Sequence, residues 1–192
     1  MPGWAQQSRA QTSAANYAQS YSRKTWMVGV QAGRSRGLLL GNNLTAQIYG
    51  GYFITNNVMV GLSGAVSKEE TEGIGVRDLV WSVGPTIRYQ ITRSRISPFV
   101  VASYQFGQRT VSGSSQVMGP TSGSRISGDN TPRPIQTRMF GFGVSIGIVP
   151  ALRADLAINW QDKASAYNPT IRLNDGLFQP QFGLHYLISA KK

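Results

Sequence analysis

From Lys24 onward the chain alternates with period two, and one of the two resulting faces is apolar and almost free of charge. In the first such segment, Trp26, Val28 and Val30 share one face, while the other face is built from Met, Gly and Gln. Strict alternation is typical of β-strands. A soluble barrel would need charged residues on its outer face, so an apolar outer face predicts that lipid surrounds this chain.

The alternating pattern recurs in eight segments, near residues 24–33, 44–52, 58–66, 79–91, 100–106, 140–148, 152–160 and 178–188. Tight links near Asn56, residues 93–97 and Pro150 alternate with longer polar links. No run of 18 apolar residues occurs, which excludes a transmembrane helix. The sequence therefore predicts an all-β fold, an eight-stranded antiparallel up-and-down transmembrane β-barrel. It also predicts a bulge or a local break in the fourth strand, where Pro85 lacks a donor.

The domain organisation follows from composition. Charged residues make up 14% of the chain, against about 25% in average soluble domains, and 192 residues allow one domain. Residues 24–190 form the predicted barrel, and residues 1–23 are expected to be a disordered N-terminal segment. Its start resembles the end of a secretory signal cut after Ala5, although a natural polar N-terminus fits equally well. Residues 108–134 are predicted to be a long mobile loop, either a recognition surface or a solvated tip without a ligand.

Aromatic residues of the apolar face are expected at two heights along the threaded strands. Such girdles mark the two membrane interfaces of transmembrane barrels. The girdle near the short turns contains Trp26, Tyr52, Tyr89 and Tyr186, and the girdle near the long loops contains Trp81, Tyr104, Phe106, Phe140, Trp160 and Phe178.

The inner face of an eight-stranded barrel is just wide enough for side chains to fill it. A packed polar core is therefore predicted from Gln31, Gln47, Ser82, Gln105, Ser145, Asn159 and Gln181. Arg88 and Asp155 are the clearest inward charges, and a lone buried charge costs several kcal/mol, so they are expected to form an interior charge pair. Arg153 and Arg138 are assigned to the same inward parity, at opposite rims where water would solvate them.

The formal net charge of +11 does not indicate nucleic acid, because the basic residues are not gathered into a binding platform with exposed aromatics. On the turn side the cations are expected to touch phospholipid headgroups: Arg9, Arg23, Lys24, Arg93, Arg95, Lys191 and Lys192. On the loop side acidic residues accompany the cations, which could meet lipopolysaccharide phosphates: Arg34, Arg36, Lys68, Arg77, Arg109, Arg125, Arg133, Lys163 and Arg172.

Three stretches of the chain resemble small eight-stranded outer-membrane barrels of the OmpA/OmpX kind: residues 83–89 leading to 96–99, residues 151–156, and residues 182–186. The resemblance covers residues 24–189 and implies a Gram-negative outer membrane with the N-terminus in the periplasm. Members of this group commonly end on an aromatic residue read by the insertion machinery. This chain departs from that pattern, because it continues past Tyr186 to Lys191 and Lys192.

The sequence offers no catalytic constellation. Its single histidine, His185, lies on the inner face without an obvious nucleophile or carboxylate beside it in sequence, and there is no cysteine. No catalytic residue, metal site or cofactor is predicted. The predicted function is a structural or surface-interaction barrel that displays its loops to lipid or to a protein partner. A narrow porin-like channel for ions or small solutes, a subunit of a larger envelope complex, and a soluble carrier with reversed faces are the alternatives.

Overall fold

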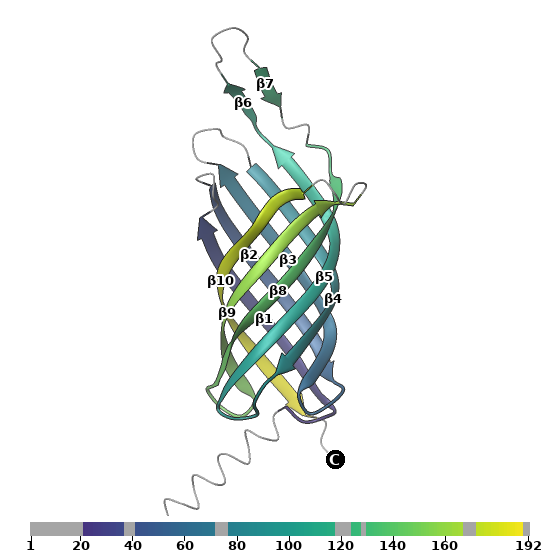
Figure 1. Ribbon diagram of the computed structural model, residues 1–192, viewed down its shortest axis with the longest axis vertical. Coiled ribbons are helices and arrows are strands. Elements are labelled where there is room, and N and C mark those ends of the chain that lie inside the picture. Colours follow the sequence, from purple (N-terminus) through teal and green to yellow (C-terminus); the bar gives the residue numbers. More distant parts are fainter. Residues whose placement is uncertain are drawn as a thin grey trace, which may run out of the picture.

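The computed structural model describes residues 21–36, 41–71, 77–117, 124–127, 130–166 and 172–189. Long strands dominate these ranges (Figure 1). The barrel strands are β1 (Thr25–Arg36), β2 (Gly41–Phe53), β3 (Val58–Thr71), β4 (Arg77–Gln90), β5 (Ile96–Ser112), β8 (Arg133–Gly147), β9 (Leu152–Ser165) and β10 (Arg172–Ser189). Within the described ranges, no helix has the length and apolar character needed to cross a membrane.

The barrel is closed in the order β1-β10-β9-β8-β5-β4-β3-β2, and all neighbours are antiparallel. Closure occurs between the first and last strands, where Thr25 lies opposite Ser189. Because consecutive strands are neighbours, the chain runs up and down, and the predicted fold class is confirmed. We call the end with residues 54–57, 91–95 and 148–151 the turn end, and the opposite end the loop end.

The two faces alternate as the sequence predicts. Along β4, from Trp81 to Gln90, exposed and buried side chains alternate without exception. Every member of the predicted polar core is buried: Gln31, Gln47, Ser82, Gln105, Ser145, Asn159 and Gln181. The exposed residues in the same strands are large and apolar, such as Ile48, Leu62 and Phe182. This inside-out distribution is stable only where the surroundings are lipid.

Pro85 interrupts the sheet on one side only. It pairs with Leu62 of β3, but the ladder to β5 passes from the Val83–Phe106 pair directly to the Thr86–Ser103 pair. The register is the same on both sides of the gap. The missing proline donor therefore produces a local break without a bulge.

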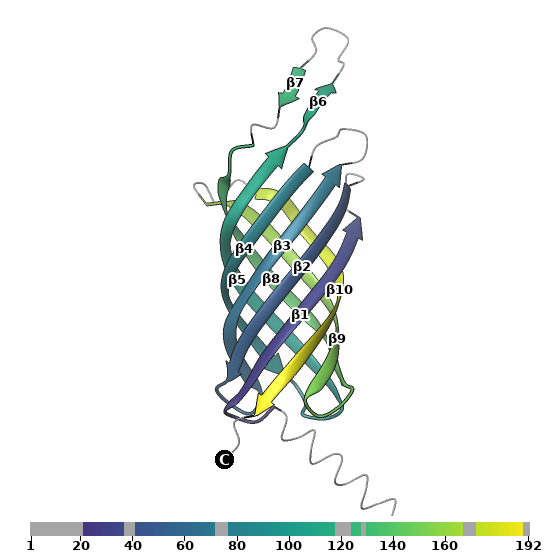
Figure 2. The same cartoon turned by 180° about the vertical axis from the view of Figure 1, so that it is seen from behind.

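The segment expected to be one long loop is partly a β-structure. β5 and β8 stay paired up to Arg109 and Arg133, and β5 continues to Ser112. Beyond them β6 (Ser114–Val117) and β7 (Ser124–Ser127) form a separate two-stranded sheet, which projects from the loop end (Figures 1 and 2). Strand pairing satisfies backbone groups whatever the side chains are. The Gly- and Ser-rich composition of this segment therefore predicts a loop even though the backbone forms two paired strands.

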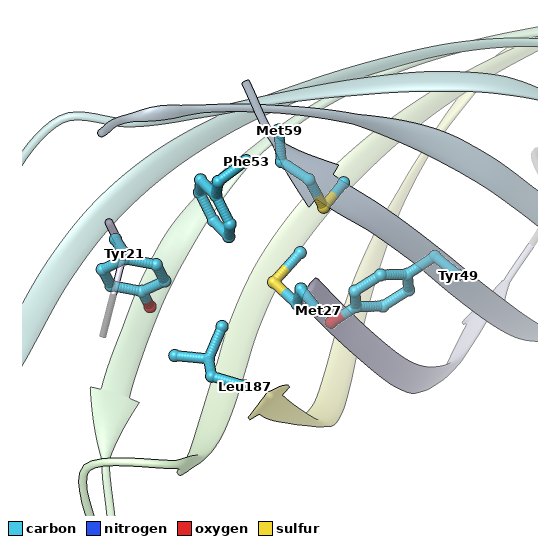
Figure 3. Packing of buried hydrophobic residues seen from close by; sticks show 6 residues of the cluster. All are labelled: Tyr21, Met27, Tyr49, Phe53, Met59 and Leu187. Atoms are coloured by element: carbon cyan, nitrogen blue, oxygen red, sulfur yellow. The ribbon is translucent and has the colours of Figure 1, made fainter. Parts of the chain in front are cut away.

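The expected disordered segment of residues 1–23 differs at its end. Residues 1–20 lie outside the described residues, but the Tyr21 side chain is fully buried inside the turn end. There it belongs to an apolar cluster with Met27, Tyr49, Phe53, Met59 and Leu187 (Figure 3). Its ring centroid lies 5.5 Å from that of Phe53. The cluster covers the polar interior, and Tyr21 is an aromatic side chain with enough apolar surface to join it.

Candidate functional site

A charge cluster lies inside the turn half of the barrel. Arg88 of β4 and Asp155 of β9 meet across the interior, with Arg88 Nη1 2.7 Å from Asp155 Oδ2 and Nη2 3.3 Å from Oδ1. The Arg88 side chain is 3% exposed and that of Asp155 is inaccessible. This two-pronged contact matches the planar guanidinium to the carboxylate and offsets the cost of burying both charges.

Asp155 has two further partners from other strands. Tyr49 of β2 donates its hydroxyl to Asp155 Oδ2 at 3.0 Å, and His185 Nδ1 of β10 lies 3.1 Å from the same oxygen. Gly29 of β1 makes this arrangement possible. A Cβ atom at Gly29 would lie 2.5 Å from Tyr49 Cζ and 2.7 Å from His185 Cβ.

Arg88 is held by two more contacts. Its Nε donates to Gln90 Oε1 at 3.2 Å, and its Cζ lies 3.6 Å from the centroid of the Phe99 ring. A guanidinium against a ring face gains a cation–π attraction when both are shielded from water. Arg88 is therefore fixed from three directions, by a carboxylate, an amide and an aromatic face.

Arg153 is buried, which corrects the expectation of a solvated rim charge. Its Nε donates to Ser145 Oγ at 3.1 Å, and its Nη2 donates to the carbonyl oxygens of Ser94 and Arg95 at 2.8 and 2.9 Å. Its Cζ lies 4.7 Å from the Tyr21 ring centroid, and the Tyr21 hydroxyl is 3.0 Å from Ser145 Oγ. Carbonyl groups of the turn at residues 91–95 thus satisfy the charge in place of water.

Arg138 lies on the outer face of β8, which corrects the expectation of an inward side chain. It is exposed, two residues from outward Phe140, and Asp162 of β9 is opposite to it. Positions two apart in a strand share a face, so parity with Phe140 requires an outward side chain. Arg138 therefore belongs to the outer rim at the loop end.

The loop half of the interior is built mostly from neutral polar side chains. Gln105 accepts from Ser82 Oγ and donates to Ser63 Oγ, both at 2.7 Å. Asn159 Nδ2 donates to Gln181 Oε1 at 2.7 Å. Charges return only near the rim, where Lys163 Nζ lies 3.0 Å from Ser67 Oγ and Arg109 Nε donates to Asp78 Oδ2 at 2.6 Å.

Little empty space remains beside the charge cluster. The cavity among Gln31, Tyr49, Arg88, Phe99 and their neighbours has a volume of about 10 Å³, which is near the lower limit for one water molecule. The apolar cluster that includes Tyr21 lies between this region and the turn end. The arrangement is that of a packed interior and not of a pore lining.

The outer face forms a band with aromatic side chains near both ends. Trp26, Tyr89 and Tyr186 near the turns are about half exposed, and so are Trp81, Phe106 and Phe140 near the loops. Tyr52, Tyr104 and Trp160 are partly covered, and Phe178 is exposed. Toward the loop end the band stops at outward polar residues: Arg34, Lys68, Arg77 and Arg138.

His185 points into the barrel and is 1% exposed, with Nδ1 against Asp155. A histidine enclosed in this way cannot reach a lipid ester at the membrane surface. Among the described residues there is no group of three or more His, Asp or Glu side chains that could hold a metal ion. The carboxylate beside His185 is that of Asp155, which also pairs with Arg88. Sequence spacing did not indicate that it lies beside His185. Tyr49 could have been noticed as an aromatic residue on a polar strand face.

The fold defines the chain as an eight-stranded up-and-down β-barrel with an apolar exterior and a polar, filled interior. It is the fold of the small outer-membrane barrels. Neisserial surface protein A is similar over 84% of this chain and 95% of its own, with 14% identity and a TM-score of 0.55. Ail of Yersinia pestis in complex with the heparin analogue sucrose octasulfate covers 86% and 97%, with 16% identity and a TM-score of 0.50.

The outer membrane enzyme PagL also matches, over 86% of this chain and 99% of its own, with 14% identity. Its TM-score of 0.47 is too low to carry an argument about activity. No protein-family model matches the sequence, and no curated protein does. The shared property is therefore the fold alone.

Proposed function

We propose that this protein is an integral outer-membrane β-barrel with a structural or surface-interaction role, its turn end in the periplasm and its loop end outside. Short periplasmic turns and longer external connections are the rule in such barrels. In this orientation the N-terminus is periplasmic and the β6–β7 hairpin extends away from the cell. The observation that carries the proposal is the combination of an apolar, girdled exterior with an interior closed by its own side chains.

The filled interior favours a surface-interaction role over a channel for ions or small solutes. An ion crossing the barrel would have to displace the Arg88–Asp155 pair and the apolar cluster around Tyr21, since the cavity beside the pair has a volume of about 10 Å³, barely enough for one water molecule. In planar bilayers the protein should therefore show no stable conductance steps. Reproducible single-channel steps that persist in the unaltered protein would favour the narrow porin-like channel instead.

A catalytic role has no support among the described residues. The one histidine is enclosed and shares its carboxylate with Arg88. A nucleophile, a base and an orienting group would have to meet at the lipid boundary for lipid hydrolysis or acyl transfer. We infer that the protein is not an enzyme.

The loop end is the proposed interaction surface. Among the side chains that the structure describes and does not bury there, the cations are Arg34, Lys68, Arg77, Arg109, Arg133 and Arg138, and the carboxylates are Glu69, Glu70 and Asp78. This excess of positive charge suits phosphate groups of outer-membrane lipid, or an anionic protein partner. The barrel of Ail was solved with a sulfated heparin analogue, which is compatible with polyanion binding by a barrel of this shape.

Insertion and orientation can be tested together. A folded barrel resists SDS until it is heated, so its gel mobility should shift on boiling. The chain lacks cysteine, and single cysteines can therefore be placed at the exposed positions Thr131 and Arg93. In intact Gram-negative cells an impermeant maleimide should label Thr131→Cys and not Arg93→Cys. The reverse labelling pattern would invert the proposed orientation, and folding in plain buffer without a mobility shift would refute membrane insertion.

A further inference from the structure

A groove of about 550 Å³ crosses the outer face of the barrel over β10, β1, β2, β3 and β4. Figure 2 shows this side of the molecule, with β1 to β4 facing the viewer. The outward residues at its floor are small, namely Ala32, Ala46 and Gly64, whereas Phe182 and Trp81 stand at its two ends. The groove therefore lies among side chains that the proposed orientation places in lipid.

Strand register produces the groove. Ala32 lies opposite Ala46, which lies opposite Val66, and this row of outward residues ends at Phe182 on β10 and at Trp81 on β4. Neighbouring strands are about 4.8 Å apart, so two adjacent alanines leave a depression between bulkier residues. Gly64, opposite Ile48, extends it by one row.

Cations stand beside the groove on its loop side. Arg34 follows Ala32 as the next outward residue of β1, and Lys68 follows Val66 as the next outward residue of β3. Arg77 lies farther along β4. The only described carboxylate facing outward among them is Glu70, which is 2.8 Å from Lys68 Nζ and 3.0 Å from Arg77 Nε. Among the side chains that the structure describes on this outer rim, three cations thus accompany one carboxylate, an excess of positive charge that suits a phosphate.

A second outer groove lacks such a rim. It measures about 560 Å³ and lies over β5, β8, β9 and β10, with Val100, Phe142 and Leu156 in its lining. On its loop side, where the first groove has Arg34 and Lys68, the next outward residues of β5, β8 and β9 are Ala102, Phe140 and Trp160. An apolar hollow with cations directly on its loop side therefore occurs in the first groove and not in this one.

We propose that the first groove binds an acyl chain of a phosphorylated lipid of the outer leaflet, the lipid A part of lipopolysaccharide, while Arg34 and Lys68 contact its phosphate. The inference rests on the proposed function, because only the proposed orientation puts this end of the groove in the outer leaflet. A second copy of the chain fits less well. A two-fold interface would bring identical patches face to face, and with them two sets of the same cations.

Native mass spectrometry of the refolded full chain in detergent, titrated with purified bisphosphorylated lipid A, tests the site. We expect one lipid A bound per barrel. Ala46→Trp fills the groove and should weaken binding about tenfold through lost packing. The matched control Ala102→Trp, also on the outer face, between Ile87 and Phe140, should bind as the wild type does. Equal binding by Ala46→Trp and the wild type would overturn the groove assignment.

Charge reversal tests the headgroup contact. Arg34→Glu and Lys68→Glu should each weaken binding about fivefold or more, as expected for a cation near an anionic lipid surface. Arg93→Glu makes the same charge change at the turn end and should have no effect. Fully dephosphorylated lipid A should bind the wild type weakly, and it should bind Lys68→Glu with the same weak affinity, because it has no phosphate for Lys68 to contact. Unchanged affinity in these cases would refute the phosphate contact.

The heat-dependent gel shift, run on every variant, separates the two proposals. A shift without lipid A binding would refute the site and leave the outer-membrane barrel intact, whereas loss of the shift in wild type would refute the proposed function itself. A wild-type dimer in sedimentation that Ala46→Trp dissociates, with no lipid A retained, would identify the groove as a contact between copies and overturn the lipid proposal.

Discussion

The turn half and the loop half of the barrel interior are built on different principles. In the turn half, Arg88, Asp155, His185 and Arg153 are buried, and each is held by partners from other strands or turns. In the loop half, neutral contacts such as that of Asn159 with Gln181 prevail, and charges appear near the rim.

The difference indicates that the turn half contributes more to stability than the loop half. A buried charge that loses its partner costs several kcal/mol, while a lost neutral hydrogen bond costs about 1 kcal/mol. Substitutions in the turn half should therefore lower the free energy of unfolding far more than those in the loop half. The loop end, which we propose as the interaction surface, is therefore expected to tolerate substitutions better than the turn end.

Removing the carboxylate of the charge cluster is expected to have the largest effect. Asp155→Ala leaves Arg88 buried without its counter-charge and should lower the free energy of unfolding by about 3–5 kcal/mol. Urea unfolding in lipid vesicles measures it. The control Arg88→Met with Asp155→Leu removes both charges together and should recover most of the loss. A loss below about 1 kcal/mol for Asp155→Ala would remove the energetic contrast between the halves.

The Tyr21 side chain tests whether the segment before β1 is part of the turn-half core. Tyr21→Ala empties a fully buried site and should cost about 3 kcal/mol of unfolding free energy. Tyr21→Phe keeps the ring and loses only the hydrogen bond to Ser145, at about 1 kcal/mol. Both are measured by urea unfolding. If Tyr21→Ala were as stable as wild type, the Tyr21 side chain would not contribute to the stability of the barrel core.

A neutral contact in the loop half should matter less. Gln105→Ala deprives the hydroxyls of Ser82 and Ser63 of their shared partner and should cost about 1–2 kcal/mol of unfolding free energy. Ser103→Ala is the control on the same strand face, because Ser103 Oγ makes no hydrogen bond within the described part of the chain. Unfolding curves of the two variants should differ clearly. A loss as large as that of Asp155→Ala would make the two halves equivalent.

The smallest effect is expected at the outer rim. The Arg77 side chain is 67% exposed and pairs with the half-exposed Glu70, and such surface ion pairs contribute little to stability. Arg77→Ala should unfold at the same urea concentration as wild type. Glu70→Gln, which removes the other partner, should behave alike. A clear destabilisation by either variant would show that the rim pair contributes to the fold.

Much of the barrel could be read from alternation. The eight segments, their inward polar residues and the outward aromatics at both ends follow from the period of two, because a strand in a closed barrel can present only two faces. Local chemistry also predicts a bulge or a break at Pro85, and the unchanged register shows that it is a break. Arg138 was assigned to the wrong face although its spacing from Phe140 contains the right answer.

Apart from the expected pair of Arg88 with Asp155, the partners of buried groups could not be predicted in this way. That Asp155 accepts from Tyr49 and contacts His185, and that the turn at residues 91–95 satisfies Arg153, depends on strands far apart in sequence. The paired β6–β7 extension and the burial of Tyr21 have a different reason: neither segment shows the alternation from which the barrel strands were predicted.

The sequence alone determined which residues face lipid and which face inward, because that choice is made residue by residue along each strand. The tertiary structure decided which inward residues touch, where the interior is closed, and how two alanines on neighbouring strands leave a groove beside Arg34 and Lys68. The physical reason is register. Contacts across a barrel depend on how strands are aligned and how the sheet closes, and alternation by itself specifies neither.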